Sequence, residues 1–431
     1  MNNVIDPEPE AIHRFLLSLT LEEQHGFTEL ITLAADNPEF YQLLIREPRE
    51  TLAKFSIGST SVSRLMAAPP YKAAAAINFG HCRNPIAKGM SESRLIYLGE
   101  ESVSQENWTQ AMLHSAFNQT VLTELDRRYW DFVMSLPSSQ ALLATDLRIA
   151  AGTGPSTPFR TIAQLGGVIS LPWGFYDTFP QLDQGQLLAT GETWLFVMLA
   201  MLLRDNLNDG QVSVSSNAVE LQQQFMARAR NILHSLVRDQ ISFWTHFEEY
   251  EHQVISGLQL EAQYRASPNS PYDITVAQQI GYSKLALCKT VPCVMAVLGD
   301  AVSLLRHLEF SLDSLAAGRQ LLDDVVDWQE DLTRGHYTYP LIQAIDQLSS
   351  LGKTVSSQAI STEIANSIIL EDTLHHAEAW HQQALAAVAD IPCTGWVELL
   401  KHSMEDCVSY HRELVFHRIV RELNRDSTTN N

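Results

Sequence analysis

Three observations predict an all-α fold. The 431-residue chain has only 20 glycines, and no stretch shows the alternating β-branched pattern of half-buried strands. Apolar residues make up 45% of the chain, which is ample for a large core. Where apolar residues cluster, they recur at the spacing of one helix face. We therefore expect helices throughout.

The net charge and the cysteine spacing argue against some classes of protein. A net charge of −21 argues against a nucleic-acid surface, which needs a basic patch. The five cysteines form no CxxC pair, so we expect free thiols in a reducing cytosol. No signal peptide is evident at the N-terminus. The longest apolar run, Trp194 to Leu203, is about half of what crosses a bilayer. We expect a soluble, cytoplasmic protein without a membrane span.

The first third of the chain reads as short helices around a loop-rich stretch. Residues 8–56 have amphipathic helical patterns, 57–103 are poorly patterned, and the helical pattern resumes from 104 to 151. A Gly/Ser/Thr/Pro cluster at 152–158 then predicts a turn. The predicted division is an N-terminal helical region, 1–151, and a catalytic α domain, 152–431, although both could share one core.

Helical patterns continue through the second part. We expect one long helix over 217–266, then helices over 273–300 and 301–331, and several more from 340 to the end. Before them lies an aromatic loop framed by prolines, Leu171 to Pro180. Its aromatic residues could simply be core or could line or cap a pocket. The loop contains four aromatic residues, of which Trp173, Phe175 and Phe179 are the candidates for a pocket wall and Tyr176 is the fourth.

The stretch from Gln320 to Pro340 carries the strongest chemical signal. Asp323, Asp327 and Asp331 are four residues apart on a predicted helix, with Asp324 beside them. These carboxylates repel one another, and a hard cation with oxygen ligands, Mg²⁺ above all, would offset the repulsion. The alternative is a solvated acidic helix face.

A second acidic motif favours the metal site. Asp205 and Asp209 are also four apart, and they close the apolar run that begins at Thr193. Gly210 is a good helix stop behind them. Two carboxylate pairs that each end an apolar helix predict facing helices that bind metal ions together.

The two motifs resemble those of the all-α isoprenoid synthase superfamily, which comprises trans-prenyltransferases and class I terpene synthases. The stretch Asp205–Asp209 is similar to its DDxxD motif, with Asn206 in place of the second aspartate. Arg319–Asp327 is similar to its FQxxDDxxD motif, with arginine in place of phenylalanine. Lys289-Thr290 matches a lysine-threonine pair whose lysine contacts diphosphate in the family. The implied fold is an isoprenoid-synthase-type helical bundle around a central active-site cavity, with extra N-terminal helices.

The resemblance also implies a cofactor and a substrate. The cofactor would be a cluster of three Mg²⁺ ions, with Mn²⁺ as a substitute, and the substrate a prenyl diphosphate whose leaving group the ions neutralise. A homodimer is common in the family. The expected metal ligands are Asp205, Asn206, Asp209, Asp323, Asp324 and Asp327.

Cations and apolar residues should complete the site. Lys289 is expected on the diphosphate by resemblance, and so is Arg412, placed like a C-terminal arginine of some terpene synthases. Gln320 lies one turn before the second motif, and an arginine fork suits phosphate geometry. The expected diphosphate-binding residues are Lys289, Gln320, Arg319, Arg204 and Arg412. The hydrocarbon tail should run along the helix face that precedes Asp205. That face carries Met201, Val197 and Trp194.

Three functions fit this pattern. Our main prediction is a class I terpene synthase, a lyase that ionises a linear prenyl diphosphate and cyclises the cation. It rests on a missing second anion site, because no basic pair follows Asp209 before Arg228. The first alternative is a trans-prenyltransferase that joins isopentenyl diphosphate to an allylic diphosphate, which the DDxxD-like second motif favours. The second alternative is a non-catalytic relative.

Overall fold

The structure is a computed structural model that describes residues 20–46, 48–55, 57, 119–150, 170–208, 215–265 and 272–429. Within these ranges every regular element is a helix, which confirms the all-α prediction. The N-terminal helices are α2 (Leu21–Asp36), α3 (Pro38–Arg46), α4 (Pro48–Ala53), α8 (Gln119–Ser135) and α9 (Ser138–Ala150).

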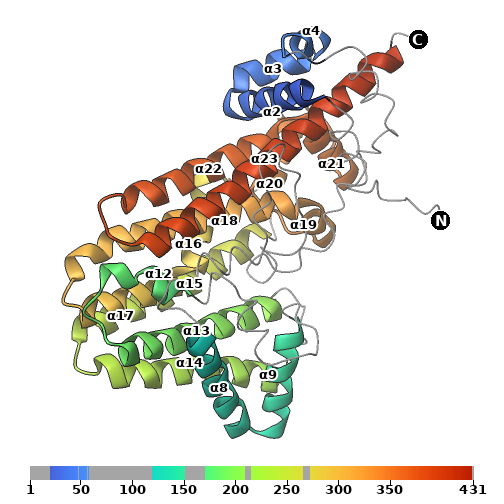
Figure 1. Cartoon of the computed structure of the whole chain (residues 1–431). Helices are drawn as coiled ribbons and strands as arrows, with labels where there is room; N and C mark the ends of the chain where they lie inside the picture. The colour runs from blue at the N-terminus through green and yellow to red at the C-terminus, as the bar shows by residue number, and fades with distance from the viewer. Residues whose placement is uncertain are drawn as a thin grey trace.

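The remaining helices form one bundle (Figure 1). They are α12 (Leu171–Gly174), η1 (Tyr176–Thr178), α13 (Gln184–Asn208), α14 (Ser216–Val237), α15 (Ile241–Arg265), α16 (Ile274–Lys284), η2 (Ala286–Lys289), α17 (Thr290–Leu298), η3 (Val302–Leu304), α18 (Leu305–Val326), α19 (Trp328–Arg334), α20 (Tyr339–Ser350), α21 (Ser357–Asn366), α22 (Ile369–Ala387) and α23 (Thr394–Thr429).

Helix α13 runs through the main core. Its residues from Trp194 to Ala200 are all buried, as expected for a helix that is apolar all round. In the described ranges, Gln184–Asp205 is the single helix long and apolar enough to cross a membrane unaided, and 78% of its apolar window is buried inside the protein. The apolar surface of α13 is therefore buried against α14, α17 and their neighbours.

A second group of helices packs around α18, with α16 and α22 against it and α23 against α22 (Figure 1). Glycines allow these close approaches. A Cβ atom at Gly281 of α16 would lie 3.0 Å from the Ala316 carbonyl oxygen and from Ala317 Cα on α18. A Cβ atom at Gly318 would lie 2.6 Å from Nδ1 of His381 on α22. The α16–α18 approach matters most, because both helices end at the candidate site.

The N-terminal helices cover two opposite ends of the bundle (Figure 1). Helices α2 to α4 pack on the C-terminal half of α23, where Phe27 meets the Phe416 ring edge-on. At the other end, α8 packs on α13 and α9 on α14. Both N-terminal groups therefore bury apolar surface against the second part of the chain.

The structure corrects three predicted helices. The predicted helix over 273–300 is divided into α16, η2 and α17. The predicted helix over 217–266 is two helices, α14 and α15, separated by residues 238–240. The predicted helix over 301–331 is interrupted at Asp327, where α18 ends and α19 begins. Residues 58–118 and the proposed boundary at 152–158 lie outside the described residues, so the division into 1–151 and 152–431 stays a prediction.

Gly281→Val tests the α16–α18 contact. The added side chain would meet the backbone of α18, so we expect unfolding in urea to show a loss of about 1–3 kcal/mol. Gly185→Ala is the matched control, because a Cβ atom there meets only Asp183 Oδ1 at 3.1 Å. An unchanged midpoint for Gly281→Val would show that the two helices are not closely packed.

Candidate active site

Four helices end at one place, and each brings a charged side chain at or near its C-terminal end. Asp205 is in the last turn of α13, Glu261 lies just before the last turn of α15, and Lys284 is the last residue of α16. Lys284 Nζ lies 3.0 Å from Glu261 Oε1 and 4.0 Å from Asp205 Oδ1. Asp205, Glu261 and Lys284 all act electrostatically on Asp323, which is in the last turn of α18. The structure therefore brings the two acidic motifs together.

Helix ends make this arrangement electrostatically unusual. The C-terminus of a helix carries a partial negative charge, which favours cations and disfavours carboxylates by about 0.3–1 kcal/mol each. Here carboxylates lie at or near the C-terminal ends of α13, α15 and α18, while the last residues of α16 and α15 are the cations Lys284 and Arg265. Carboxylates and helix ends thus add to one negative potential. Such a site attracts metal cations.

Burial adds to the cost of this charge. Asp324 is 2% exposed, and Gln320 Nε2 donates a hydrogen bond to its Oδ1 at 2.7 Å. Burial and the neighbouring Asp323 raise the pKa of Asp324 to about 7. Asp323 Oδ1 and Asp324 Oδ2 are buried and accept no hydrogen bond within the described residues. Burial removes water from these two oxygens, and no described residue donates a hydrogen bond in its place.

Asp327 occupies the joint between two helices. It ends α18 and precedes α19, with φ −101° and ψ 8°, and its backbone N–H donates to the Asp323 carbonyl at 2.9 Å. Burial and the charge of Asp323 raise its pKa. The predicted single column of carboxylates is therefore a bent one, but Asp327 remains close enough to Asp323 for the two to repel each other.

These residues fit a hard divalent cation. They offer carboxylate oxygens, which Mg²⁺ and Ca²⁺ prefer, and two of those oxygens are buried without a partner. In the described part of the chain no three acidic, histidine or cysteine side chains surround a single point as metal ligands would. A metal ion bound here would therefore need further ligands, such as water or a bound anion, to complete its coordination. Asp209 and the side chain of Asn206 lie outside what the structure describes.

Lys289 lies away from this cluster, and its expected contact with diphosphate stays a prediction. Its side chain is 5% exposed, lies 2.9 Å from Asp313 Oδ1 and donates to Gln253 Oε1 at 2.8 Å. Asp313 precedes Asp323 by ten residues, which is about 15 Å along α18. The lysine at the acidic cluster is Lys284, which the sequence analysis missed together with Glu261. The sequence signal that could have pointed to Lys284 is Gly281, one turn earlier. A glycine on a helix face allows a close approach to a neighbouring helix, here α18.

The predicted polar ligands are distributed around the cluster. Arg319 acts electrostatically on Asp323, and its Nη1 lies 3.9 Å from Asp406 Oδ2 on α23. The side-chain amide of Gln320 donates a hydrogen bond to Asp324. The Arg204 side chain is half-buried and lines a neighbouring cavity, and burial lowers its pKa. Arg412 Nε is buried without a hydrogen-bond partner in the described ranges.

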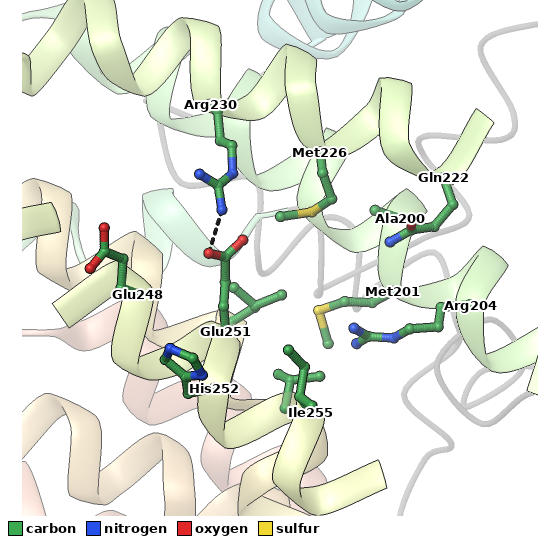
Figure 2. Close-up of a pocket in the computed structure, with 12 residues that line it drawn as sticks. Ala200, Met201, Arg204, Gln222, Met226, Arg230, Glu248, Glu251, His252 and Ile255 are labelled. Carbon is green, nitrogen blue, oxygen red and sulfur yellow. Dashed lines mark hydrogen bonds and ion pairs between the residues drawn. The ribbon is translucent and has the colours of Figure 1, made fainter. Parts of the chain in front are cut away.

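An apolar cavity of about 320 Å³ lies beside the first motif, between α13, α14 and α15 (Figure 2). Met201 lines it, one turn before Asp205, together with Ala200 and Arg204. Its other apolar walls are Met226, Val254, Ile255 and Leu287. A volume of this size is at the lower end of the range for small-molecule sites.

Most of the predicted cavity residues belong to the core instead. Trp194 and Val197 are 2% and 0% exposed and lie in the main apolar cluster. The Trp173 ring fills the space left by Gly191, where a Cβ atom would lie 2.3 Å from it. Phe175 packs on Trp396 with ring centroids 5.1 Å apart, and Phe179 is fully buried. Of the predicted cavity residues, Met201 alone lines the cavity described here.

Comparison with solved structures identifies the class of fold. No protein-family model and no curated protein matches the chain. The chain is similar to heptaprenyl diphosphate synthase from Staphylococcus aureus, with a TM-score of 0.54 and 14% identity over 67% of this chain and 99% of that chain. The chain thus has the fold of the all-α isoprenoid synthase superfamily, as predicted.

Two further solved structures are similar to the chain. Geranylgeranyl pyrophosphate synthase from Corynebacterium glutamicum matches with a TM-score of 0.53 and 15% identity, over 77% of this chain and 99% of that chain. Octaprenyl pyrophosphate synthase from Helicobacter pylori matches with a TM-score of 0.51 and 15% identity, over 68% of this chain and 100% of that chain. A second structure of the Corynebacterium enzyme, with a TM-score of 0.52, holds calcium and isoprenyl diphosphate.

These structures overturn the main functional prediction. All three proteins are prenyl diphosphate synthases, which are transferases, so the prediction of a terpene cyclase acting as a lyase is contradicted. The cyclase prediction depended on the absence of a basic motif after Asp209. An absent motif is weak support, because cations from other helices can form an anion site.

Lys289→Ala tests the structural place of that lysine. The change leaves the half-buried Asp313 without its cation, so we expect a loss of about 1–3 kcal/mol in the free energy of unfolding. Lys401→Ala is the control, because Lys401 is 51% exposed and pairs only with its neighbour Glu398. We expect that variant to stay within about 0.5 kcal/mol of the wild type. Equal stability of both variants would contradict the buried ion pair.

Asp327→Asn tests the accumulated negative charge in the metal-free protein. A carboxyl group whose pKa is higher in the folded state than in the unfolded state destabilises the fold once it is ionised. The free energy of unfolding therefore falls as the pH rises from the unfolded-state pKa to the folded-state pKa. Burial and the charge of Asp323 raise the pKa of Asp327 from 3.8 to about 8, so the interval runs from about pH 4 to pH 8. We expect the melting temperature of Asp327→Asn relative to wild type to rise over this interval. Added Mg²⁺ should reduce the difference; a constant difference would contradict the prediction.

Proposed function

We propose that this protein is a metal-dependent prenyl diphosphate synthase, which transfers an allylic prenyl group to isopentenyl diphosphate. One observation carries the proposal: carboxylates on three helix C-termini converge with Lys284 beside an apolar cavity. A diphosphate needs the charged end of such a site, and a prenyl chain needs the apolar end. The similarity to three prenyl diphosphate synthases supports the same reaction.

The reaction breaks the bond between the allylic carbon and the diphosphate oxygen. The isopentenyl double bond then forms the new carbon–carbon bond, and the joined product loses a proton to restore a double bond. Asp205, Asp323 and Asp327 would hold the divalent ions, with Asp324 and Asp209 assisting. The ions, proposed to be Mg²⁺, would neutralise the charge of the leaving diphosphate. The chain's own task is to hold both substrates with water excluded.

Cations of the chain have separate tasks in this proposal. Lys284 lies among Asp205, Glu261 and Asp323, so it would donate to the same diphosphate that the metal ions bind. Arg319 lies within electrostatic reach of Asp323 from the same helix. Arg204 lines the cavity next to the first motif, where its fork would meet a diphosphate oxygen at the mouth.

The cavity would receive the prenyl tail. Its mouth lies beside Asp205, because Met201 and Arg204 line it from the last turns of α13. Met226, Val254 and Leu287 provide apolar contacts without polar groups that would need hydrogen bonds. Cytoplasmic location, the choice of Mg²⁺ and a homodimer remain predictions within this proposal.

The decisive assay supplies Mg²⁺, an allylic diphosphate of ten to twenty carbons, and isopentenyl diphosphate. We expect a prenyl diphosphate at least one five-carbon unit longer, detected by chromatography after dephosphorylation. No turnover with any primer, or products formed equally well without isopentenyl diphosphate, would contradict the proposal. The first of these outcomes would favour a non-catalytic relative.

Single variants locate the activity at the cluster. Asp205→Asn, Asp323→Asn and Lys284→Ala should each lower kcat/KM at least about 100-fold, because each removes a charge that neutralises or holds diphosphate. Circular dichroism should show that each variant is folded. Lys401→Ala, on the exposed face of α23, should retain wild-type activity. Full activity in Lys284→Ala would exclude that residue from the diphosphate site.

A further inference from the structure

Arg319 lies between two carboxylates that belong to different helices. Asp323 follows it by four residues on α18, so the two side chains share one helix face. On the other side, Arg319 Nη1 lies 3.9 Å from Asp406 Oδ2 on α23. Burial raises the pKa of Asp323 and of Asp406 to about 6, and the charge of Arg319 opposes the shift in both. One guanidinium therefore neutralises part of the charge of two anions.

The nearer of these anions in sequence has a buried oxygen to which Arg319 does not donate. A cation and a carboxylate four residues apart on a helix attract each other, so Arg319 could pair with Asp323 without leaving α18. Asp323 Oδ1 nevertheless accepts no hydrogen bond from the described residues. Attraction to Asp406 draws the guanidinium toward α23 instead. The buried oxygen of Asp323 is thereby left for a different cation.

The other neighbours of Asp406 do not supply a competing positive charge. His402 Nε2 lies 3.8 Å from Asp406 Oδ1, but burial and the charge of Arg319 lower the pKa of His402 to about 4. Burial likewise lowers the pKa of His381 on α22 to about 4. Both rings are neutral at neutral pH. Glu405, the next acidic side chain on α23, is 62% exposed and points away into solvent. Of these side chains, Arg319 carries the positive charge that faces Asp406.

We propose that Asp406 is a positioning residue for the metal site, which attracts Arg319 toward α23 and keeps it off the Asp323 oxygen that a divalent cation would bind. The inference rests on the proposed function, in which Asp323 holds a divalent ion. It adds a residue that acts on this ligand through Arg319. Without the charge of Asp406, Arg319 pairs with Asp323, and a metal ion must displace it.

Asp406→Asn removes the charge with little change in size. Mg²⁺ binding is followed at pH 8 by the rise in melting temperature with Mg²⁺ concentration, in the presence of inorganic diphosphate. We expect the half-maximal Mg²⁺ concentration to rise at least about fivefold, because charges in contact are strongly coupled. Glu405→Gln is the matched control: it removes the same charge one residue away, from an exposed side chain, and should leave the Mg²⁺ concentration unchanged.

A double-variant cycle separates an action through Arg319 from the loss of a nearby negative charge. Arg319→Gln and Arg319→Gln/Asp406→Asn should have the same half-maximal Mg²⁺ concentration, because no guanidinium remains to compete. Asp406→Glu, which keeps the charge, should bind Mg²⁺ like the wild type. If Asp406→Asn weakens Mg²⁺ binding equally with and without Arg319, the proposal is wrong. Equal Mg²⁺ binding by wild type and Asp406→Asn also overturns it.

Metal binding and turnover together separate this inference from the proposed function. A wild type that binds Mg²⁺ but gives no elongated product contradicts the proposed function, while the Mg²⁺ titrations still test Asp406. A wild type that elongates its substrate, with an unchanged Mg²⁺ dependence in Asp406→Asn, contradicts the inference alone. A wild type without any response to Mg²⁺ contradicts both. Should Asp406→Asn fail to fold, Asp406→Ser removes the same charge and has the same expected result.

Discussion

The accumulation of negative charge at one end of the bundle is the constraint on which the rest of the site depends. Asp323 and Asp324 lie where α18 ends, Asp205 where α13 ends and Glu261 where α15 ends. Helix dipoles and burial both disfavour ionised carboxylates there. Lys284 offsets part of the charge, and Arg319 acts on Asp323 from one side. A cluster this costly lowers stability unless a bound cation repays it, so its presence argues for metal-dependent chemistry.

The main features of the site could be read from helix periodicity. Asp205 and Asp323 each follow an apolar run that must be buried, which suggested facing helices. In the structure the two carboxylates are within electrostatic reach of each other. The bend at Asp327 could not be read in this way, because its i, i+4 hydrogen bonds to Asp323 and Asp331 continue the helical spacing.

Lys289 shows how little a short motif says about the direction in which a side chain points. The Lys-Thr dipeptide matched a familiar pair, but η2 interrupts the helix between Lys284 and Thr290. Residues five apart point about 140° apart around a helix, and Lys289 contacts Asp313 while Lys284 contacts the acidic cluster. A dipeptide match carries no information about this direction. For the aromatic loop the sequence left two interpretations open, core or pocket wall, and Trp173 and Phe175 are buried in the core.

The position of Asp205 depends on an ion-pair network far from the chemistry. Glu192, 2% exposed in the middle of α13, accepts hydrogen bonds from Arg128 on α8 and Arg228 on α14. Such a buried carboxylate adds little net stability, but only one register of α13 satisfies both arginines. Asp205 lies thirteen residues further on, about 20 Å along the same helix. The N-terminal helix α8 thereby helps to fix how far the first acidic motif extends toward α18, which links the N-terminal region to the geometry of the site.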